Sequence, residues 1–185
     1  MGTKIDKVTV REQMRGFRIS KSERAKASMI IRDALTAFPC WKAARTILLY
    51  APLPDEPDTF MLPGKGKRFC YPRYHVDRGY EAALVNASDE LFPGMFGVLE
   101  PRQEARKIPA MELDLVLVPG MAFDEECYRL GRGRGFYDRW LPVLSGLKYG
   151  LGFDHQLIPS VPRETHDAKL DGVIIPSRSV GMPYN

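Results

Sequence analysis

The chain has 185 residues, of which 44% are hydrophobic and 27% charged, a balance that suits a globular protein with one core and excludes a disordered or fibrous chain. Its formal net charge of +4 favours small anionic ligands, but without repeated basic and aromatic positions it does not indicate a nucleic-acid-binding protein. No apolar run reaches about 18 residues, no signal-like apolar segment lies near residue 1, and the three cysteines are widely separated, so we expect a cytoplasmic protein without membrane contacts, disulfides or zinc.

Two helices are predicted before residue 40. Residues 6–18 mix apolar and basic side chains in the manner of an amphipathic helix, which would form an N-terminal arm. Ser20 and Glu23 have the spacing of a capping box, so a second helix begins there. Apolar side chains then recur at helical spacing and predict one buried stripe, formed by Ile31, Ala34, Leu35 and Phe38. Pro39 ends this helix.

Short apolar runs rich in β-branched and aromatic residues predict the strands. They are residues 46–50, 68–71, 81–85, 113–118, 149–153 and 172–175. Residues 86–110 are rich in proline, glycine and charge, and we expect loops and short turns there. Because the strands alternate with helical patterns, the sequence predicts an α/β sheet with helices on its faces, in a single domain that spans residues 1–185.

A loop rich in glycine and arginine follows residues 113–118, the strongest predicted strand. It runs Arg-Leu-Gly-Arg-Gly-Arg-Gly-Phe-Tyr-Asp over residues 129–138, and residues 136–144 have the apolar spacing of a short helix. Glycine lets main-chain N–H groups approach an anion, and the arginine fork matches phosphate oxygens. An ordinary turn or a basic tail is the alternative, but apolar elements flank the loop, so we predict an ordered phosphate site. The loop has neither Walker A spacing nor the full Gly-x-Gly-x-x-Gly of Rossmann folds.

This loop and residues 118–124 (Val-Pro-Gly-Met-Ala-Phe-Asp) together resemble the signature of the 5-formyltetrahydrofolate cyclo-ligase family, also called 5,10-methenyltetrahydrofolate synthetases. Weaker matches in family order extend over nearly the whole chain, namely Lys7-x-x-x-Arg11, Asp55-Glu56-Pro57-Asp58, Tyr71-Pro72-Arg73-Tyr74, Glu100-Pro101 and His166-Asp167-x-x-x-Asp171. Two positions depart from the family pattern. Phe136 stands where the family often has a second tyrosine, and it lacks the hydroxyl. Arg134 stands where lysine or another residue is common, and the positive charge is kept.

The resemblance implies both a fold and a reaction. The fold would be a three-layer α/β sandwich with a mixed, mostly parallel sheet, similar to the NagB/RpiA/CoA-transferase-like fold, with an N-terminal helical arm. In the reaction, ATP would phosphorylate the formyl oxygen of 5-formyltetrahydrofolate with the help of Mg²⁺. N10 would then attack the activated carbon, and 5,10-methenyltetrahydrofolate, ADP and phosphate would be released. The partners would be these two small-molecule substrates, with no nucleic acid and no membrane, and we expect a monomer.

The resemblance also implies four overlapping sets of site residues. The catalytic set is Arg132, Arg134 and Tyr137. The ATP-binding set is Lys7, Arg11, Arg129, Gly131, Arg132, Gly133, Arg134, Gly135, Phe136 and Tyr137. The folate-binding set is Ala51, Glu56, Tyr74, Arg132, Gly133, Arg134, Gly135 and Phe136. The Mg²⁺ ligands are Asp138 and Asp171, and no chemistry is assigned to Glu100.

Several of these assignments keep an alternative. Arg129 would either bind phosphate or brace the loop through a carboxylate. Asp138 also suits a helix start, and Asp171 a turn before a strand. Tyr74 and Tyr137 are equally suited to a core position. For the protein as a whole, the alternatives are a relative of phosphosugar isomerases or CoA-transferases, and a non-catalytic phosphate- or RNA-binding module.

Overall fold

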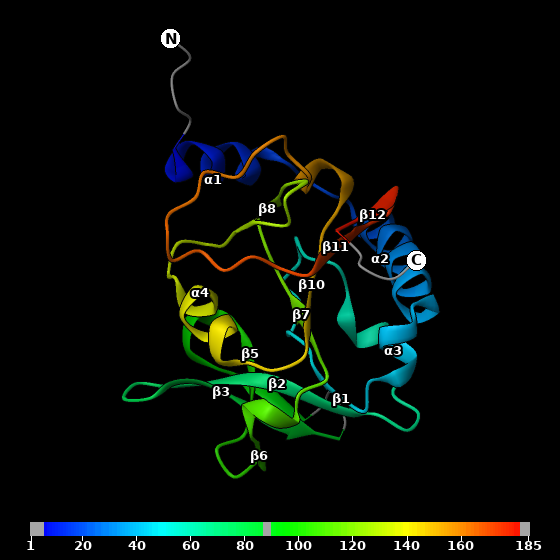
Figure 1. The fold of residues 1–185 in the computed structure, drawn as a ribbon, viewed down its shortest axis with the longest axis vertical. Coiled ribbons are helices and arrows are strands. Elements are labelled where there is room, and N and C mark those ends of the chain that lie inside the picture. Colours follow the sequence, from blue (N-terminus) through cyan, green and yellow to red (C-terminus); the bar gives the residue numbers. More distant parts are fainter. Residues whose placement is uncertain (1–5, 87–89, 182–185) are drawn as a thin grey trace.

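The computed structural model describes residues 6–86 and 90–181, and its centre is an eight-stranded sheet in the order β12-β11-β10-β7-β1-β2-β3-β6 (Figure 1). Strands β11, β10, β7, β1 and β2 are parallel, whereas β12, β3 and β6 lie antiparallel to their neighbours. The strands of this sheet are β1 (Thr46–Leu48), β2 (Arg68–His75), β3 (Gly79–Val85), β6 (Lys107–Ile108), β7 (Leu115–Val118), β10 (Leu147–Leu151), β11 (Gly172–Ile175) and β12 (Arg178–Val180). The predicted α/β fold with a mixed, mostly parallel sheet is confirmed.

Strand β7 lies in the middle of the sheet because its sequence is apolar on both sides. Leu115 and Leu117 belong to the core on one face, and Val116 and Val118 to the core on the other. All four side chains are fully buried. Such continuous apolar runs are typical of parallel strands that helices cover on both faces.

Helices cover both faces of the sheet (Figure 1). On one face, α2 (Lys21–Ala37) and α3 (Pro39–Ala43) bury Leu35 and Trp41 in the core that contains Leu115. On the other face, α4 (Phe136–Trp140) and the 3₁₀ helix η5 (Leu141–Val143) contribute to the core that contains Val116. The result is a layer of sheet between two layers of helix, as predicted.

Helix α2 begins with the predicted capping box. The Glu23 N–H donates to Ser20 Oγ, and the Ser20 N–H donates to the Glu23 carboxylate at 2.9 Å. Each bond satisfies a main-chain group that the first turn of a helix leaves unpaired. Local sequence therefore sets this boundary, and the structure keeps it.

Helix α1 (Lys7–Gly16) is the predicted N-terminal arm, and it packs against a small core of its own. Val10 and Met14 are its buried side chains, and they contact the ribbon formed by β8 (Ala122–Phe123) and β9 (Arg129–Leu130). Because β9 leads directly into the glycine- and arginine-rich loop, α1 is held beside that loop.

The structure differs from the predicted elements mainly at residues 86–110. This predicted loop contains β4 (Leu91–Pro93), β5 (Leu99–Pro101), β6 and the 3₁₀ helix η3 (Met95–Gly97). Two further 3₁₀ helices, η1 (Thr59–Met61) and η4 (Ala110–Glu112), lie before β2 and before β7, and η6 (Asp154–Gln156) follows β10. Elements this short form because tertiary neighbours pair with them, and local sequence does not report such neighbours. None of the helices in the described part of the chain is long and apolar enough to cross a membrane.

Candidate active site

A cavity of about 650 Å³ opens where β1 and β7 end. Tyr50 and Ala51 line it just after β1, and Pro119 and Gly120 just after β7. The chain leaves β1 toward β2 on one side, and leaves β7 toward β10 on the other, so this is a switch point of the sheet. Parallel sheets leave a crevice at such points, and the volume suits a small-molecule ligand.

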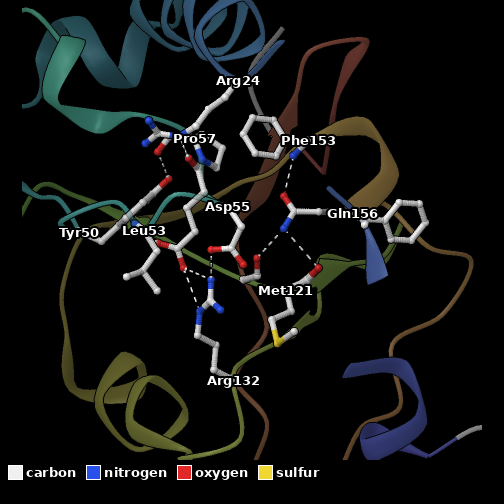
Figure 2. A network of polar contacts seen from close by, with 12 residues as sticks. Arg24, Tyr50, Leu53, Asp55, Pro57, Met121, Arg132, Phe153 and Gln156 are labelled. Carbon is white, nitrogen blue, oxygen red and sulfur yellow. Dashed lines mark hydrogen bonds and ion pairs between the residues drawn. The ribbon is translucent and has the colours of Figure 1, made fainter. Parts of the chain in front are cut away.

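A buried amide holds the turn that follows β7 (Figure 2). Gln156 Nε2 donates to the carbonyl oxygens of Gly120 and Met121 at 3.0 and 3.3 Å. Its Oε1 accepts from the Phe153 N–H at 2.7 Å. Because this side chain is fully hydrogen-bonded, it fixes the main chain that forms one side of the cavity.

The glycine- and arginine-rich loop forms a second side of the cavity. Gly133 has φ +104° and Gly135 has φ +63°, conformations that side-chain-bearing residues rarely adopt. Gly135 is the N-terminal cap of α4, and the Gly131 carbonyl accepts from Arg11 Nε at 2.9 Å. The cavity is lined by every loop residue from 129 to 138, as well as by Lys7 and Arg11 of α1. The structure therefore brings the predicted ATP-binding set together.

Arg132 is paired with two carboxylates (Figure 2). Its Nη2 lies 3.0 Å from Glu56 Oε1 and 2.7 Å from Asp55 Oδ1. Glu56 is only 4% exposed, and its other oxygen accepts from the Leu53 N–H at 3.0 Å. Burial raises the pKa of Glu56, although Arg132 and the Leu53 N–H act in the opposite direction. A buried carboxylate and an arginine that joins it to the loop therefore lie side by side in the cavity.

The segment that carries Glu56 is itself tied down. Tyr50 Oη donates to the Pro57 carbonyl at 3.0 Å, and Arg24 Nε of α2 donates to the Glu56 carbonyl at 2.8 Å (Figure 2). These bonds connect the segment to β1 and to a helix on the sheet face. Glu56 is thus presented from a fixed main chain, a requirement for selective recognition.

Arg129 braces the loop. Its side chain is 2% exposed, and Nη2 lies 2.7 Å from Asp138 Oδ1. The guanidinium carbon of Arg129, Cζ, lies over the Tyr137 ring, 5.4 Å from the ring centroid. Burial lowers the pKa of Arg129, and the nearby Asp138 partly offsets this effect. Of the two alternatives for Arg129, bracing is therefore the one seen, although the residue also lines the cavity.

Another acidic side chain, Asp167, lines the cavity and lies near α1. Its carboxylate lies 2.7 Å from Lys7 Nζ, and Oδ2 accepts from the Glu164 N–H at 2.7 Å. Burial alone would raise the pKa of Asp167, but Lys7 and the Glu164 N–H lower it. The ion pair connects α1 to residues 164–167 across the cavity.

The structure corrects the prediction that Asp171 is a metal ligand. Asp171 lies at the amino end of β11, where Oδ2 accepts from the Lys148 N–H at 2.7 Å. The cavity is at the carboxyl ends of the parallel strands, which is the opposite edge of the sheet, and Asp171 does not line it. The sequence motif contains both Asp167 and Asp171, and spacing alone could not decide which one reaches the site.

The predicted folate-binding role of Tyr74 stays a prediction. Tyr74 lies on β2 and is not among the residues that line the cavity. Its ring packs against Phe136 and Tyr80, with centroid distances of 5.2 and 5.4 Å. Tyr74 and Tyr80 are directly opposite partners in the β2–β3 ladder, so their side chains lie on the same face, and Tyr74 packs against two aromatic residues that line the cavity.

Two carboxylates that could serve a metal ion, Asp138 and Asp167, line the cavity. Within the described residues, no group of three histidine, cysteine or acidic side chains has metal-binding geometry. Mg²⁺ needs no such group, since it keeps several waters and is commonly held by one or two carboxylates and by phosphate oxygens. The donor set of the cavity fits Mg²⁺ bound together with a phosphate ligand.

Sequence reasoning missed other cavity residues because they come from short or irregular segments. They include Leu53, Tyr80, Val98, Leu99, Glu100, Glu164 and Asp167. A signal existed for Glu100 and Asp167, since both belong to segments that match the family order. The remaining residues carry no pattern that separates them from core or surface positions.

These features define an α/β protein with one cavity, in which a cationic glycine-rich loop lies beside a buried carboxylate. The sequence model of the 5-formyltetrahydrofolate cyclo-ligase family matches residues 3–176, so the chain belongs to this family.

Individual relatives agree with the family match. The chain is 30% identical over 176 residues to a probable 5-formyltetrahydrofolate cyclo-ligase of Schizosaccharomyces pombe, with coverage of 83% of this chain and 85% of the relative. It is 31% identical over 154 residues to the 5-formyltetrahydrofolate cyclo-ligase of Escherichia coli K12, covering 78% and 85%. The solved 5,10-methenyltetrahydrofolate synthetase of Aquifex aeolicus superposes with a TM-score of 0.82 at 27% identity, covering 97% of this chain and 94% of that one.

Proposed function

We propose that this protein converts 5-formyltetrahydrofolate and ATP into 5,10-methenyltetrahydrofolate, ADP and phosphate. The observation that carries the proposal is one cavity in which Arg132 joins a cationic glycine loop to the buried carboxylate of Glu56. The phosphate donor would bind the cationic loop while the folate binds beside the Glu56 carboxylate, so the reaction needs both surfaces in one cavity. Membership of the family supports this assignment.

The loop side of the cavity is the proposed ATP site. Arg132 and Arg134 would hold the terminal phosphates, together with main-chain N–H groups of the loop glycines. Lys7 and Arg11 extend the positive charge from α1. Phosphoryl transfer depends mainly on positioning and on neutralised charge, so the site needs no protein nucleophile.

Asp138 and Asp167 would hold Mg²⁺. Bound there, the ion would neutralise charge on the transferring phosphate. Asp138 pairs with Arg129, and Asp167 pairs with Lys7. Binding of the ion would exchange these ion pairs for metal–carboxylate contacts.

The other side of the cavity is the proposed folate site. The Glu56 carboxylate would accept hydrogen bonds from N–H donors of the pterin ring, next to Ala51. Phe136, Tyr137 and Tyr80 provide aromatic surface. Burial raises the pKa of the Tyr137 hydroxyl, so it would act as a neutral hydrogen-bonding group.

The proposal is tested by mixing purified protein with 5-formyltetrahydrofolate, ATP and Mg²⁺. The methenyl product has its own near-ultraviolet absorbance, so turnover is read directly. Arg132→Ala should reduce turnover by about 100-fold or more, because one charge-assisted phosphate contact is lost. If the wild-type protein forms no methenyl product, or if it consumes ATP without folate, the proposed function is refuted.

A further inference from the structure

Glu100 is a buried carboxyl group in the cavity, and within the described part of the chain it has no cationic partner. It is 8% exposed, it lies on β5, and it lines the cavity. Across residues 6–86 and 90–181, no lysine, arginine or histidine forms an ion pair with it. A buried carboxylate without a cation is costly, so a function for this group is the expected reason to keep it.

The fold holds Glu100 in one position. Oε2 accepts from the Tyr74 N–H at 3.0 Å, which ties the side chain to β2. Gly94, the residue after β4, has no side chain, and this leaves space for the Glu100 carboxyl group. A Cβ added at Gly94 would lie 2.7 Å from Glu100 Oε1. Phe92 of β4 pairs with Glu100 in the ladder. One carboxylate oxygen is therefore anchored, while the residue faces the cavity.

The other acidic groups of the cavity are already engaged or exposed. Glu56, Asp138 and Asp167 are each paired with a cation. Glu164 is 59% exposed and lies near Lys7. Asp6 is exposed and caps α1 through the Thr9 N–H.

Burial makes a carboxylate a stronger base, and a neighbouring cation makes it a weaker one. Burial also raises the pKa of Glu56, but Arg132 already occupies that carboxylate. Burial raises the pKa of Glu100, although the Tyr74 N–H and the charge of His75 act in the opposite direction. The phenol of Tyr80 is no rival as a base, because burial, and then the nearby Glu100, raise its pKa to about 12.

Ring closure in the proposed reaction releases the proton of N10, and this proton needs an acceptor. When N10 attacks the phosphorylated formyl carbon, its lone pair forms the new C–N bond and the electron pair of the C=N5 bond returns to N5. N10 is then positively charged and still carries its hydrogen. Only after this N–H bond breaks can the N10 lone pair expel phosphate with the electrons of the C–O bond.

We propose that the Glu100 carboxylate accepts the N10 proton during ring closure. The inference rests on the proposed function and adds a catalytic base to it. The N–H bond pair stays on N10, the proton moves to a Glu100 oxygen, and phosphate then leaves with the C–O pair. Glu100 afterwards returns the proton to the departing phosphate or to water, so the group ends the cycle unchanged.

The test separates the two chemical steps in a single turnover. Excess enzyme is mixed with 5-formyltetrahydrofolate, ATP and Mg²⁺, and ADP and methenyl product are measured in the same quenched samples. In Glu100→Gln, whose amide oxygen can still accept from the Tyr74 N–H, ADP should form at a rate near that of wild type. The methenyl product should form about 100-fold more slowly, which is the usual contribution of a general base.

Two further variants keep the result interpretable. Glu104→Gln removes the same charge from an exposed position in the segment that follows β5, and both rates should match wild type. Glu100→Ala should regain methenyl formation when sodium acetate is added, but not with sodium chloride. Rescue by acetate would not occur if Glu100 only supported the fold.

The outcomes are distinct. Equal slowing of ADP and methenyl formation in Glu100→Gln, or an unchanged methenyl rate, overturns the role of Glu100 and leaves the proposed function standing. Absence of acetate rescue in Glu100→Ala also overturns it. A wild-type protein that makes no methenyl product overturns the proposed function, and the role of Glu100 with it.

Discussion

Arg129 and Arg132 lie three positions apart in the same loop, yet their surroundings give them different tasks. The Arg129 side chain is buried and paired with Asp138, whereas Arg132 lies at the cavity mouth against Glu56 and Asp55. Removing the partner of a buried charge is costly. The Arg132 side chain is 40% exposed, so water can replace its contacts with the two carboxylates. Arg129 therefore maintains the loop, and Arg132 is free to exchange partners when ligands bind.

Asp138→Asn should destabilise the ligand-free protein. The substitution leaves the Arg129 guanidinium buried without a counter-charge, so the free energy of unfolding should fall by about 3 kcal/mol. Denaturant unfolding without ATP or Mg²⁺ measures this change. Asp33→Asn is the matched control, because its pair with Arg32 is 66% exposed on the Asp33 side, and it should cost less than about 1 kcal/mol. Equal effects of the two variants would contradict the bracing role of Arg129.

At the scale of elements, α1 is attached to the molecule by few contacts. Its buried side chains are Val10 and Met14, its ion pair is Lys7 with Asp167, and Arg11 donates to the Gly131 carbonyl. None of these residues belongs to the two cores of the main sheet. The helix can therefore be displaced without unfolding the sheet.

Val10→Asp should selectively weaken the binding of ATP. A carboxylate at this buried position would undock α1 from β8 and β9, and the KM for ATP should rise about tenfold, which corresponds to about 1.4 kcal/mol. The thermal midpoint should change little, since the sheet cores stay intact. Gln13→Asp places the same charge on the exposed face of α1 and should leave KM unchanged. An unchanged KM in Val10→Asp would show that α1 has no part in the ATP site.

The β2–β3 hairpin contains a cluster that predicts acid sensitivity. Burial alone would raise the pKa of Glu81, but hydrogen bonds from Arg73, His75 and Lys107 lower it to about 2, against a usual value of 4.5. A lowered pKa means that Glu81 stabilises the fold fully above about pH 4.5, and that this stabilisation is lost as the pH falls toward 2.

The free energy of unfolding of wild type and Glu81→Gln should therefore differ most at pH 6 and converge near pH 2. Urea unfolding at a series of pH values measures the difference. Glu104→Gln is the control, because Glu104 is exposed. The difference in its free energy of unfolding from that of wild type should not converge in this way. A constant difference across this range would contradict the pKa of Glu81.

At the scale of the whole molecule, three cations of the cavity are paired with carboxylates of the same cavity. Arg132 pairs with Glu56, Arg129 with Asp138, and Lys7 with Asp167. A folate that hydrogen-bonds to Glu56 would release Arg132 toward phosphate. One ion pair thus connects the two proposed sites, and binding at one must alter binding at the other.

Folate should tighten the binding of a non-hydrolysable ATP analogue by about tenfold in the wild-type protein. In Glu56→Gln, Arg132 keeps its exposed pair with Asp55 but is no longer held by the buried Glu56 carboxylate, so the analogue alone should bind at least as tightly as it does to wild type. Saturating folate should then change the affinity of this variant for the analogue only slightly. Calorimetry with and without folate measures both affinities. Asp55→Asn should retain the coupling, because Asp55 is exposed and does not line the cavity. Independent binding in the wild-type protein would contradict the exchange of partners.

Much of the fold could be predicted because its elements are locally encoded. The capping box at Ser20 sets the start of α2, and the apolar run of Leu115–Val118 requires a strand buried on both faces. The strands β4, β5 and β6 could not be predicted, since they have two or three residues each and exist through their partners. A short element has too little local preference to be recognised without its tertiary contacts.

By itself, the sequence determined the chemistry of the protein: a loop of alternating glycine and arginine after a buried strand, and its family signature. Glycine conformations and arginine charge are properties of single residues and short segments, so they are visible in the chain. Only the tertiary structure decided which carboxylates reach that loop. It brought Glu56, Glu100 and Asp167 to the cavity from distant segments and left Asp171 at the opposite edge of the sheet. The physical reason is strand direction, since residues at the carboxyl ends of parallel strands gather at one edge whatever their separation in sequence.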